Sequence, residues 1–496
     1  MVSRASGLQR AGGILLHPTS LPGSPWIGDL GDAAMHWIEW METTGCSLWQ
    51  ILPLVPTGFA NSPYDGLSAF AGNPMLISLE RIADPGIEIS TPSAPQRAEK
   101  VDFNQVERVK LQSIKRAAEA LLTSIDADFK RDYAQFCEQN RSWLDDFALF
   151  MVIRNGRQGA AWTTWEKPLK RRDPDALRTF GTQNSRPIER EKVMQFLFFR
   201  QWQAVRSTAN ARGITIIGDL PIFVSHDSAD VWAHPELFKL DHDGSPIVVA
   251  GVPPDYFSPT GQRWGNPQYR WSIMRERGFE WWVERVRSTL SLVDYIRLDH
   301  FRGFVQSWEI PGKAETAERG EWVTVPGKEL FQTLKEELGE LPFIAEDLGM
   351  ITPDVHQLRD ELGLPGMKVL QFGLEGGEGH EFLPDKYKVH CVAYTGTHDN
   401  DTAKNWYLTS STETKVFTQQ TLPGAGPIAW RMIEAIWASK AAWVIAPLQD
   451  FLDLGSEGRM NLPGTLADNW TWRAPADSLT TELSKRIKTL NERYNR

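Results

Sequence analysis

The sequence predicts an α/β protein whose core is a closed (β/α)8 TIM barrel, and three observations lead to this fold class. About eight short apolar runs have the length and composition of buried parallel strands, and most of them end in polar or charged residues. Helical patterns separate most of the runs, and alternating strands and helices indicate a parallel sheet. Eight such units favour a barrel over an open sheet, and no glycine-rich dinucleotide turn follows the first run.

The expected elements follow one another along the whole chain. The strands are residues 13–16, 48–52, 214–217, 295–298, 343–345, 367–370, 391–394 and 443–446. The helices that we expect between them include residues 32–44, 279–292, 328–338, 353–362 and 426–439. Each strand is short enough to end at the rim of a barrel, where its last polar residue meets those of the other strands.

The spacing of the strands is uneven, which predicts large, mainly helical insertions. We expect residues 1–53 to form the first part of the barrel and residues 54–213 to hold barrel elements plus an inserted helical subdomain, because much of that stretch is helical and charged. Residues 214–496 would complete the barrel. Within them, residues 221–282 are rich in Gly, Pro and Trp, and the pair Pro253-Pro254 would stiffen this second insertion so that it holds aromatic side chains in place.

Composition excludes several classes of function. The 496 residues include 53 Lys and Arg against 63 Asp and Glu, and the formal charge of −10 disfavours a general affinity for nucleic acid or anionic membranes. No apolar stretch is long enough to span a bilayer, and no secretory signal follows the N-terminus, so we expect a cytoplasmic location. Only three cysteines occur and none forms a CxxC pair, which argues against a disulfide framework or a structural zinc site. The 21 Trp indicate either a Trp-rich core or sugar-binding surfaces.

Three carboxylates follow expected strands. Asp299 comes after the fourth strand, Glu346 after the fifth and Asp399 after the seventh. Catalytic groups of such barrels sit at the C-terminal ends of the strands, so these side chains can converge. Arg297 lies two residues before Asp299 and hence on the same face, where its charge would keep the carboxylate ionised, as a nucleophile requires. Of the adjacent Glu346 and Asp347 only one should face the barrel axis, and the pattern does not choose between them.

This set of groups fits retaining glycosyl transfer. That reaction needs two carboxyl groups roughly 5–5.5 Å apart, one as nucleophile and one as acid and base. A third carboxylate can hold ring hydroxyls more strongly at the transition state, and His398 beside Asp399 could donate to a sugar hydroxyl. Helix capping is the alternative for any one carboxylate. A divalent metal is another, but Arg297 would compete with it, so we expect neither a metal nor a cofactor.

Longer strings of residues resemble one known family. Residues 297–303 (RLDHFRG), 346–349 (EDLG), 397–401 (THDND) and 218–224 (GDLPIFV) resemble the active-site regions of the α-amylase superfamily as found in amylomaltases. The strings that narrow the resemblance to amylomaltases, or 4-α-glucanotransferases, are residues 17–23, 62–64, 68–74, 227–232, 249–258, 261–267 and 459–465. Together they run from about residue 10 to residue 473.

The resemblance implies roles for the matching positions. Asp299 would be the nucleophile, Glu346 rather than Asp347 the acid and base, and Asp399 the transition-state stabiliser. The loop at residues 455–465 would cover the cleft, and residues 221–282 would include a glucan-binding loop. The implied substrate-binding residues are Tyr64, Asp219, Asp255, Tyr256, Phe257, Trp264, Asn266, Arg297, His300, His398 and Asn461.

The resemblance also implies an activity and a domain limit. The enzyme would move α-1,4-glucan segments from donor maltodextrins to the 4-hydroxyl of an acceptor glucan or glucose, through a covalent glycosyl-aspartate. Its partners would be maltooligosaccharides and α-1,4-glucans. The family usually lacks a C-terminal β-domain, and the tail after residue 446 is too short for one. An α-glucan hydrolase with the same carboxylates and a non-catalytic glucan-binding protein are the alternatives.

Overall fold

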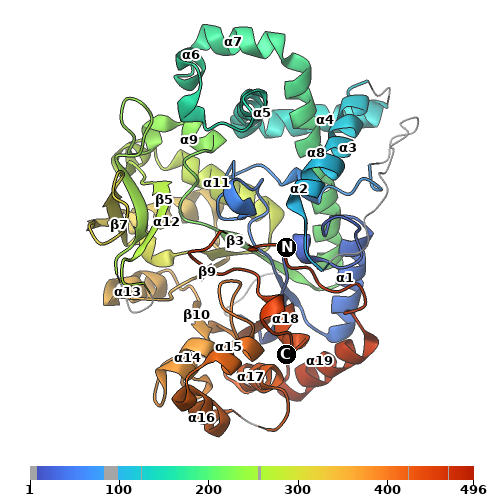
Figure 1. Cartoon of the computed structure of the whole chain (residues 1–496), viewed down its shortest axis with the longest axis vertical. Coiled ribbons are helices and arrows are strands. Elements are labelled where there is room, and N and C mark those ends of the chain that lie inside the picture. Colours follow the sequence, from blue (N-terminus) through green and yellow to red (C-terminus); the bar gives the residue numbers. More distant parts are fainter. Residues whose placement is uncertain (1–7, 83–98, 124–125, 255–257, 423, 467) are drawn as a thin grey trace.

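A computed structural model of the chain describes residues 8–82, 99–123, 126–254, 258–422, 424–466 and 468–496 (Figure 1). Eight parallel strands form a closed barrel in the order β1-β12-β11-β10-β9-β6-β3-β2. They are β1 Ala11–Leu15, β2 Leu48–Gln50, β3 Thr215–Leu220, β6 Tyr295–Leu298, β9 Phe343–Ala345, β10 Gly366–Val369, β11 Cys391–Tyr394 and β12 Trp443–Pro447. The predicted (β/α)8 class is therefore confirmed, with every expected strand in place.

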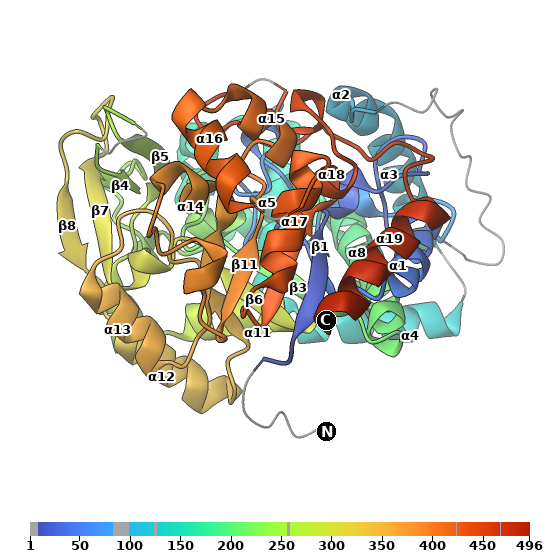
Figure 2. The same cartoon turned by 90° about the horizontal axis from the view of Figure 1, so that it is seen from below.

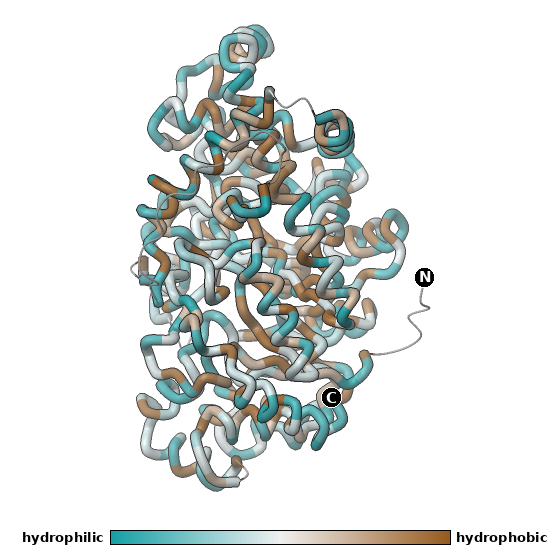
Figure 3. Tube along the Cα trace, turned by 90° about the vertical axis from the view of Figure 1, so that its right-hand side faces the viewer, coloured by the Kyte–Doolittle hydropathy of each residue, from teal (hydrophilic) through white to brown (hydrophobic). Residues whose placement is uncertain are grey.

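Helices surround this barrel and bury their apolar sides against it. They include α1 Asp32–Thr44, α11 Glu280–Leu292, α12 Gly327–Leu338, α13 Pro353–Glu361, α17 Ile428–Ala438 and α19 Thr481–Tyr494. In α1 the buried residues Trp37, Ile38 and Met41 recur at helical spacing, and Gly45 ends the helix with a φ of 72°. Figure 3 shows hydrophobic segments gathered in the interior and hydrophilic ones on the outside. No described helix is both long and apolar enough to cross a membrane.

Helices fill the long connection between β2 and β3 and lie at the top of Figure 1. They are α2 Phe103–Gln105, a π-helical turn at Val106–Leu111, α3 Gln112–Leu121, α4 Ala127–Gln139, α5 Arg141–Gly156, α6 Lys167–Lys170, α7 Pro174–Gln183 and α8 Ser185–Ala211. The boundaries have local causes. The side chain of Asp126 caps α4, and that of Asp173 caps α7, where Pro174 occupies the first turn.

A second, smaller sheet lies beside the barrel, at the left edge of Figure 2, and the sequence analysis did not anticipate it. The connection after β3 holds α9 Ala229–Ala233, β4 Val248–Val252, β5 Gln262–Pro267 and α10 Trp271–Glu276. Its strands join β7 Gln306–Pro311 and β8 Glu321–Thr324 in an antiparallel sheet of order β5-β4-β7-β8. Beyond β12 the described residues form α18 Leu448–Phe451, a short 3-10 turn and α19, and no further sheet.

Candidate active site

The register of β6 and β9 brings Asp299 and Glu346 together. Leu298 pairs with Ala345, so the next residue of each strand leaves the barrel at the same level. The backbone N–H of Glu346 donates to the carbonyl of Leu298 at 3.1 Å, which continues the ladder by one step. Neighbouring strands lie about 4.8 Å apart. Two side chains in this position can flank one bond of a bound substrate.

A buried arginine fixes a positive charge beside Asp299. Arg297 Nη1 lies 3.0 Å from Asp299 Oδ1. The same nitrogen donates to both carboxylate oxygens of Asp219, at 2.6 and 2.8 Å. Burial by itself would lower the pKa of Arg297, but Asp219 and Asp299 raise it well above its usual range. Asp219 is registered opposite Arg297 on β3, so the barrel itself sets this contact.

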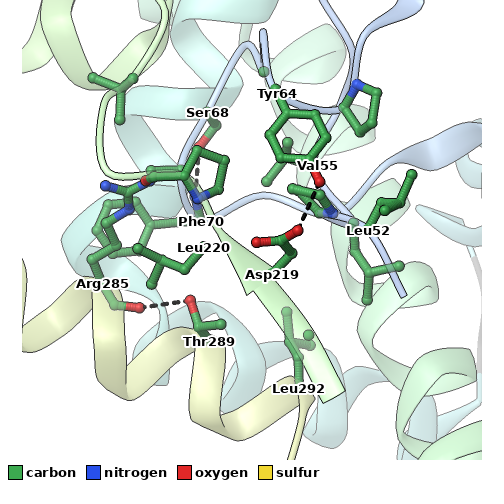
Figure 4. A pocket seen from close by; sticks show the side chains of 18 of the residues that line it. Leu52, Val55, Tyr64, Ser68, Phe70, Asp219, Leu220, Arg285, Thr289 and Leu292 are labelled. Carbon is green, nitrogen blue, oxygen red and sulfur yellow. Dashed lines mark hydrogen bonds between the residues drawn. The ribbon is translucent and has the colours of Figure 1, made fainter. Parts of the chain in front are cut away.

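Tyr64 and His398 form an aromatic wall next to this ion pair. The Tyr64 hydroxyl donates to Asp219 Oδ2 at 2.7 Å, as Figure 4 shows. The two rings stack with centroids 4.9 Å apart and 18° between their planes. Burial and the charge of Asp219 raise the pKa of Tyr64, so its hydroxyl stays protonated as a donor. The wall therefore has a fixed orientation above the strand ends.

The structure separates Glu346 from its neighbour Asp347. Glu346 Oε2 accepts from the backbone N–H of His300 at 2.6 Å, which holds it on the side of Asp299. Asp347 turns away, forms an ion pair with Arg359 and accepts from the backbone N–H of Met367 at 2.8 Å. Glu346, and not Asp347, is thus the carboxyl group beside Asp299.

The proton affinity of Glu346 differs from that of an ordinary glutamate. Burial raises its pKa to about 8, and the negative charge of Asp299 adds to this, although Arg297 acts in the opposite direction. At neutral pH this carboxyl group therefore carries a proton. A protonated carboxyl group beside an arginine-paired carboxylate is the combination that general acid catalysis by one and nucleophilic attack by the other require.

Asp399 completes the group of carboxylates, beyond the end of β11. Asn461 Nδ2 donates to its Oδ1 at 2.6 Å, and His398 Nε2 lies 3.4 Å from its Oδ2. Burial would raise the pKa of Asp399, but His398, Asn461 and Arg297 together hold it well below its usual range. The side chain of Asp399 is 49% exposed, so a ligand can reach the ionised carboxylate.

Arg459 joins the segment that carries Asn461 to the end of β11. Its guanidinium lies 3.0 Å from Asp401 Oδ2, donates to the backbone carbonyl of Asp399 at 3.2 Å and to that of Asn461 at 2.9 Å. No role was predicted for Arg459, although it lies within residues 459–465, which resemble the amylomaltases. The one feature of the sequence that could have indicated this role is the position of Arg459, a cation two residues before the predicted binding residue Asn461.

Three other predicted binding residues, Trp264, His300 and Asn266, lie in the described part of the chain. Trp264 on β5 is 39% exposed and meets His300 edge to face, with ring centroids 4.8 Å apart. Burial lowers the pKa of His300 to about 4, so its ring is neutral at pH 7. Asn266 Nδ2 donates to the carbonyl of Val224 at 2.9 Å, which fixes the segment after β3. Asp255, Tyr256 and Phe257 lie outside the described residues.

Trp470 is a residue of the site that the sequence analysis missed. Its ring lies 5.7 Å from that of Tyr64 and 6.0 Å from that of His398. As one of 21 Trp it had no distinguishing pattern. A φ of 65°, rare for a bulky side chain, is visible only in the structure.

Comparison with known proteins gives one consistent result. A sequence profile of the family described as 4-alpha-glucanotransferase matches residues 16–480. The chain is 47% identical to the 4-alpha-glucanotransferase of Synechocystis sp., covering 98% of each, and 45% identical to that of Thermus thermophilus, covering 99% of each. The solved structure of the amylomaltase from Streptococcus agalactiae in complex with acarbose superposes with a TM-score of 0.92 at 38% identity, over 98% of this chain and all of the other.

Proposed function

The chain belongs to the 4-alpha-glucanotransferase family, and from this premise we propose that it transfers glucan segments by a retaining mechanism with a covalent bond to Asp299. The enzyme class is that of its relatives, which match along nearly its whole length. The mechanism rests on one observation above all. Asp299, paired with Arg297, lies in register beside Glu346, whose pKa burial raises to about 8.

In the first half-reaction Asp299 attacks the anomeric carbon of the donor glucan. The bond from that carbon to the glycosidic oxygen breaks, and the oxygen takes the proton of Glu346. The leaving chain departs with a free 4-hydroxyl, and a β-glycosyl ester of Asp299 remains. Arg297 keeps the attacking carboxylate ionised and oriented up to that point.

In the second half-reaction Glu346 changes its role. Esterification removes the negative charge of Asp299, which is one cause of the raised pKa of Glu346, so its affinity for a proton falls. The carboxylate can then take the proton of an acceptor 4-hydroxyl as that oxygen attacks the anomeric carbon. The ester bond breaks, the Asp299 carboxylate is restored, and the product has the α configuration.

The remaining predicted residues supply binding. Asp399 offers an accessible ionised carboxylate to ring hydroxyls, whose hydrogen bonds strengthen as charge develops on the sugar. The Tyr64–His398 wall suits the apolar face of one pyranose. We further propose that Trp264 borders the path of the glucan chain, that maltooligosaccharides and α-1,4-glucans are the substrates, and that the enzyme works in the cytoplasm.

The choice between transfer and hydrolysis is tested with maltotriose as sole substrate. We expect glucose together with maltopentaose and longer chains, because release of glucose leaves a maltosyl group that adds to a second maltotriose. The total number of reducing ends should stay constant, because each cleaved bond is replaced by a new one. Product analysis by chromatography and a reducing-end assay measure the two quantities. An increase of one reducing end for each bond cleaved would identify a hydrolase and refute the transfer mechanism.

The pH dependence of kcat/KM should report the raised pKa of Glu346. Because this group must be protonated in the first half-reaction and its pKa is raised to about 8, activity is expected to fall as pH rises through about 8. An ordinary glutamate would place that fall near its usual pKa of about 4.3. Initial rates at low maltotriose concentration between pH 5 and 10 measure the position of the alkaline limb, and a limb below pH 6 would contradict this assignment.

Asn461→Ala is expected to slow transfer without unfolding the chain. A hydrogen bond to a charged group contributes about 1.5–3 kcal/mol, so losing the one to Asp399 should lower kcat by roughly 10–100-fold. Asn461→Asp should be worse, because it sets a second carboxylate against Asp399. Steady-state kinetics on the three chains give the series. Equal rates for all three would show that Asn461 does not orient Asp399.

A further inference from the structure

A second cavity, of about 230 Å³, lies between the helical insertion and the barrel. Its walls come from α5, α9, α10, the start of α11 and the segment around Ser68 and Phe70, and none of the three carboxylates of the candidate active site lines it. Of these helices, α5 and α9 pack on each other, and Figure 1 shows both in the upper half of the molecule. Ser142, Arg277 and Glu280 at its edge are exposed, so solutes can enter.

Flat aromatic rings make up much of the cavity wall. The rings of Phe70 and Trp143 are nearly parallel, 11° apart with centroids separated by 6.3 Å. Trp281 meets Phe70 edge to face at 6.0 Å and is itself only partly buried. Most of the Phe70 and Trp143 surfaces are covered. Ligand sites typically combine such apolar walls with a few placed polar groups.

Carboxylates supply the polar groups. Asp230 is 5% exposed, and its Oδ2 accepts from the backbone N–H of Ala69 at 2.8 Å. The other donor to this carboxylate in the described part of the chain is the backbone N–H of Asp230 itself. Glu280 stands at the edge and forms neither an ion pair nor a side-chain hydrogen bond within the described part of the chain. Both groups can therefore accept hydrogen bonds from the hydroxyls of a ligand.

We propose that this cavity is an accessory site for one glucosyl ring at the end of an α-glucan chain. Aromatic faces bounded by carboxylates match the apolar faces and outward hydroxyls of a pyranose. The choice of a sugar rests on the proposed function, which makes glucan the molecule that this protein meets. Drug-sized ligands fill cavities of roughly 300–1,000 Å³, so about 230 Å³ suits a single ring.

The site would touch the segment that carries Tyr64. Ser68 and Phe70 line this cavity from one side, and Tyr64 reaches Asp219 from the same segment (Figure 4). Asp230 holds the backbone of Ala69, and the N–H of Ala229 donates to the carbonyl of Leu67 at 2.9 Å. A bound ring would therefore contact, through Ser68 and Phe70, the segment that carries Tyr64.

Calorimetric titration with maltose tests the site in an Asp299→Asn background, where turnover is removed. Ser142→Trp places a large side chain at the mouth of the cavity, on an exposed helical position. Ser207→Trp is the matched control, because Ser207 is also exposed on a helix and does not line the cavity. We expect Ser142→Trp to lose one class of maltose sites and Ser207→Trp to keep it. An unchanged number of sites in both variants would overturn the proposal.

A gentler pair of variants guards against misfolding. Glu280→Gln should weaken maltose binding at the accessory site by about tenfold, since the acceptor of the hydrogen bond loses its charge. Glu276→Gln, at an exposed glutamate that does not line the cavity, should leave it unchanged. Equal maltose affinity in both variants would count against the site. A displacement experiment gives a second test: if the cavity binds an apolar dye and maltose does not displace it, the cavity is not a sugar site. The maltotriose assay on the unaltered chain tests the proposed function separately.

Discussion

Asp299→Asn is expected to lower the rate of glucan transfer by on the order of 10⁴-fold or more, because the covalent intermediate cannot form without the carboxylate. An amide oxygen is a poor nucleophile, and Arg297 would polarise it further. Initial rates on maltotriose, followed through the release of glucose, measure the loss. Asp128→Asn, at an exposed position on α4, is the control for a general effect of the substitution.

The same variant should keep its fold. Asp299 is partly exposed, and Arg297 retains its contacts to Asp219 at 2.6 and 2.8 Å when Asp299 is neutralised. The thermal midpoint should therefore stay close to that of the parent chain, as measured by circular dichroism. A variant that unfolds would assign Asp299 a structural role instead.

Covalent trapping identifies the nucleophile directly. A fluorinated glucosyl fluoride, which reacts in the first step and turns over slowly in the second, should add one glycosyl group to the parent chain, on the peptide that contains Asp299. The Asp299→Asn variant should remain unlabelled. A label on any other residue in the parent chain would refute the proposed mechanism even if transfer were confirmed.

The barrel was predictable because each of its strands can be recognised from a short stretch of sequence. Each parallel strand is buried on both faces, so it reads as a short apolar run that ends where the chain reaches the rim. Asp299 and Glu346 are the first residues after such runs, and order along the chain was enough to bring them to one rim. The second sheet has no such signature. β4 pairs with β7, and β6 of the barrel lies between these two strands in the sequence. Pairing of strands so far apart in the chain leaves no local pattern.

Other parts of the site depend on tertiary contacts that no local pattern records. The strand pattern alone did not choose between Glu346 and Asp347, although the resemblance to the family favoured Glu346; the physical reason, the ion pair of Asp347 with Arg359, is seen only in the fold. Asn461 and Trp470 come from the segment after β12, where Asn461 contacts Asp399 beyond β11 and Trp470 contacts Tyr64 in the connection after β2. Periodicity could not place them there, although the resemblance to the family did indicate Asn461.

Glu346→Gln tests catalysis and electrostatics together. On maltotriose the variant should lose activity by at least about 10²–10⁴-fold, because no acid protonates the leaving oxygen. With α-glucosyl fluoride as donor the leaving group needs no proton, so the first step should survive and Asp299 should become glycosylated. Added azide should then displace the Asp299 carboxylate from the β-glycosyl ester and release α-glucosyl azide, since this nucleophile needs no base. Equal loss on both donors would show that Glu346 is not the acid.

The variant should also change how stability depends on pH. The pKa of Glu346 is raised from 4.5 in the unfolded chain to about 8 in the folded one, so the folded state disfavours the charged form. The resulting stabilisation is complete below pH 4.5 and is lost as pH rises toward 8, at up to roughly 1.4 kcal/mol per pH unit. Glutamine cannot ionise and escapes that loss. We therefore expect Glu346→Gln to unfold at a higher temperature than the parent chain at pH 8 and at the same temperature at pH 4.

Asp347→Asn is the matched control, because it changes the adjacent carboxylate in the same way. Its buried ion pair with Arg359 would be broken, which typically costs about 3–5 kcal/mol, so this variant should be less stable at pH 8. Opposite stability changes at neighbouring positions would show that Glu346 is held in an environment unfavourable to its charge while Asp347 supports the fold. If Glu346→Gln destabilised the chain at pH 8, the carboxyl group would be ionised there, and its role as the acid would have to be abandoned.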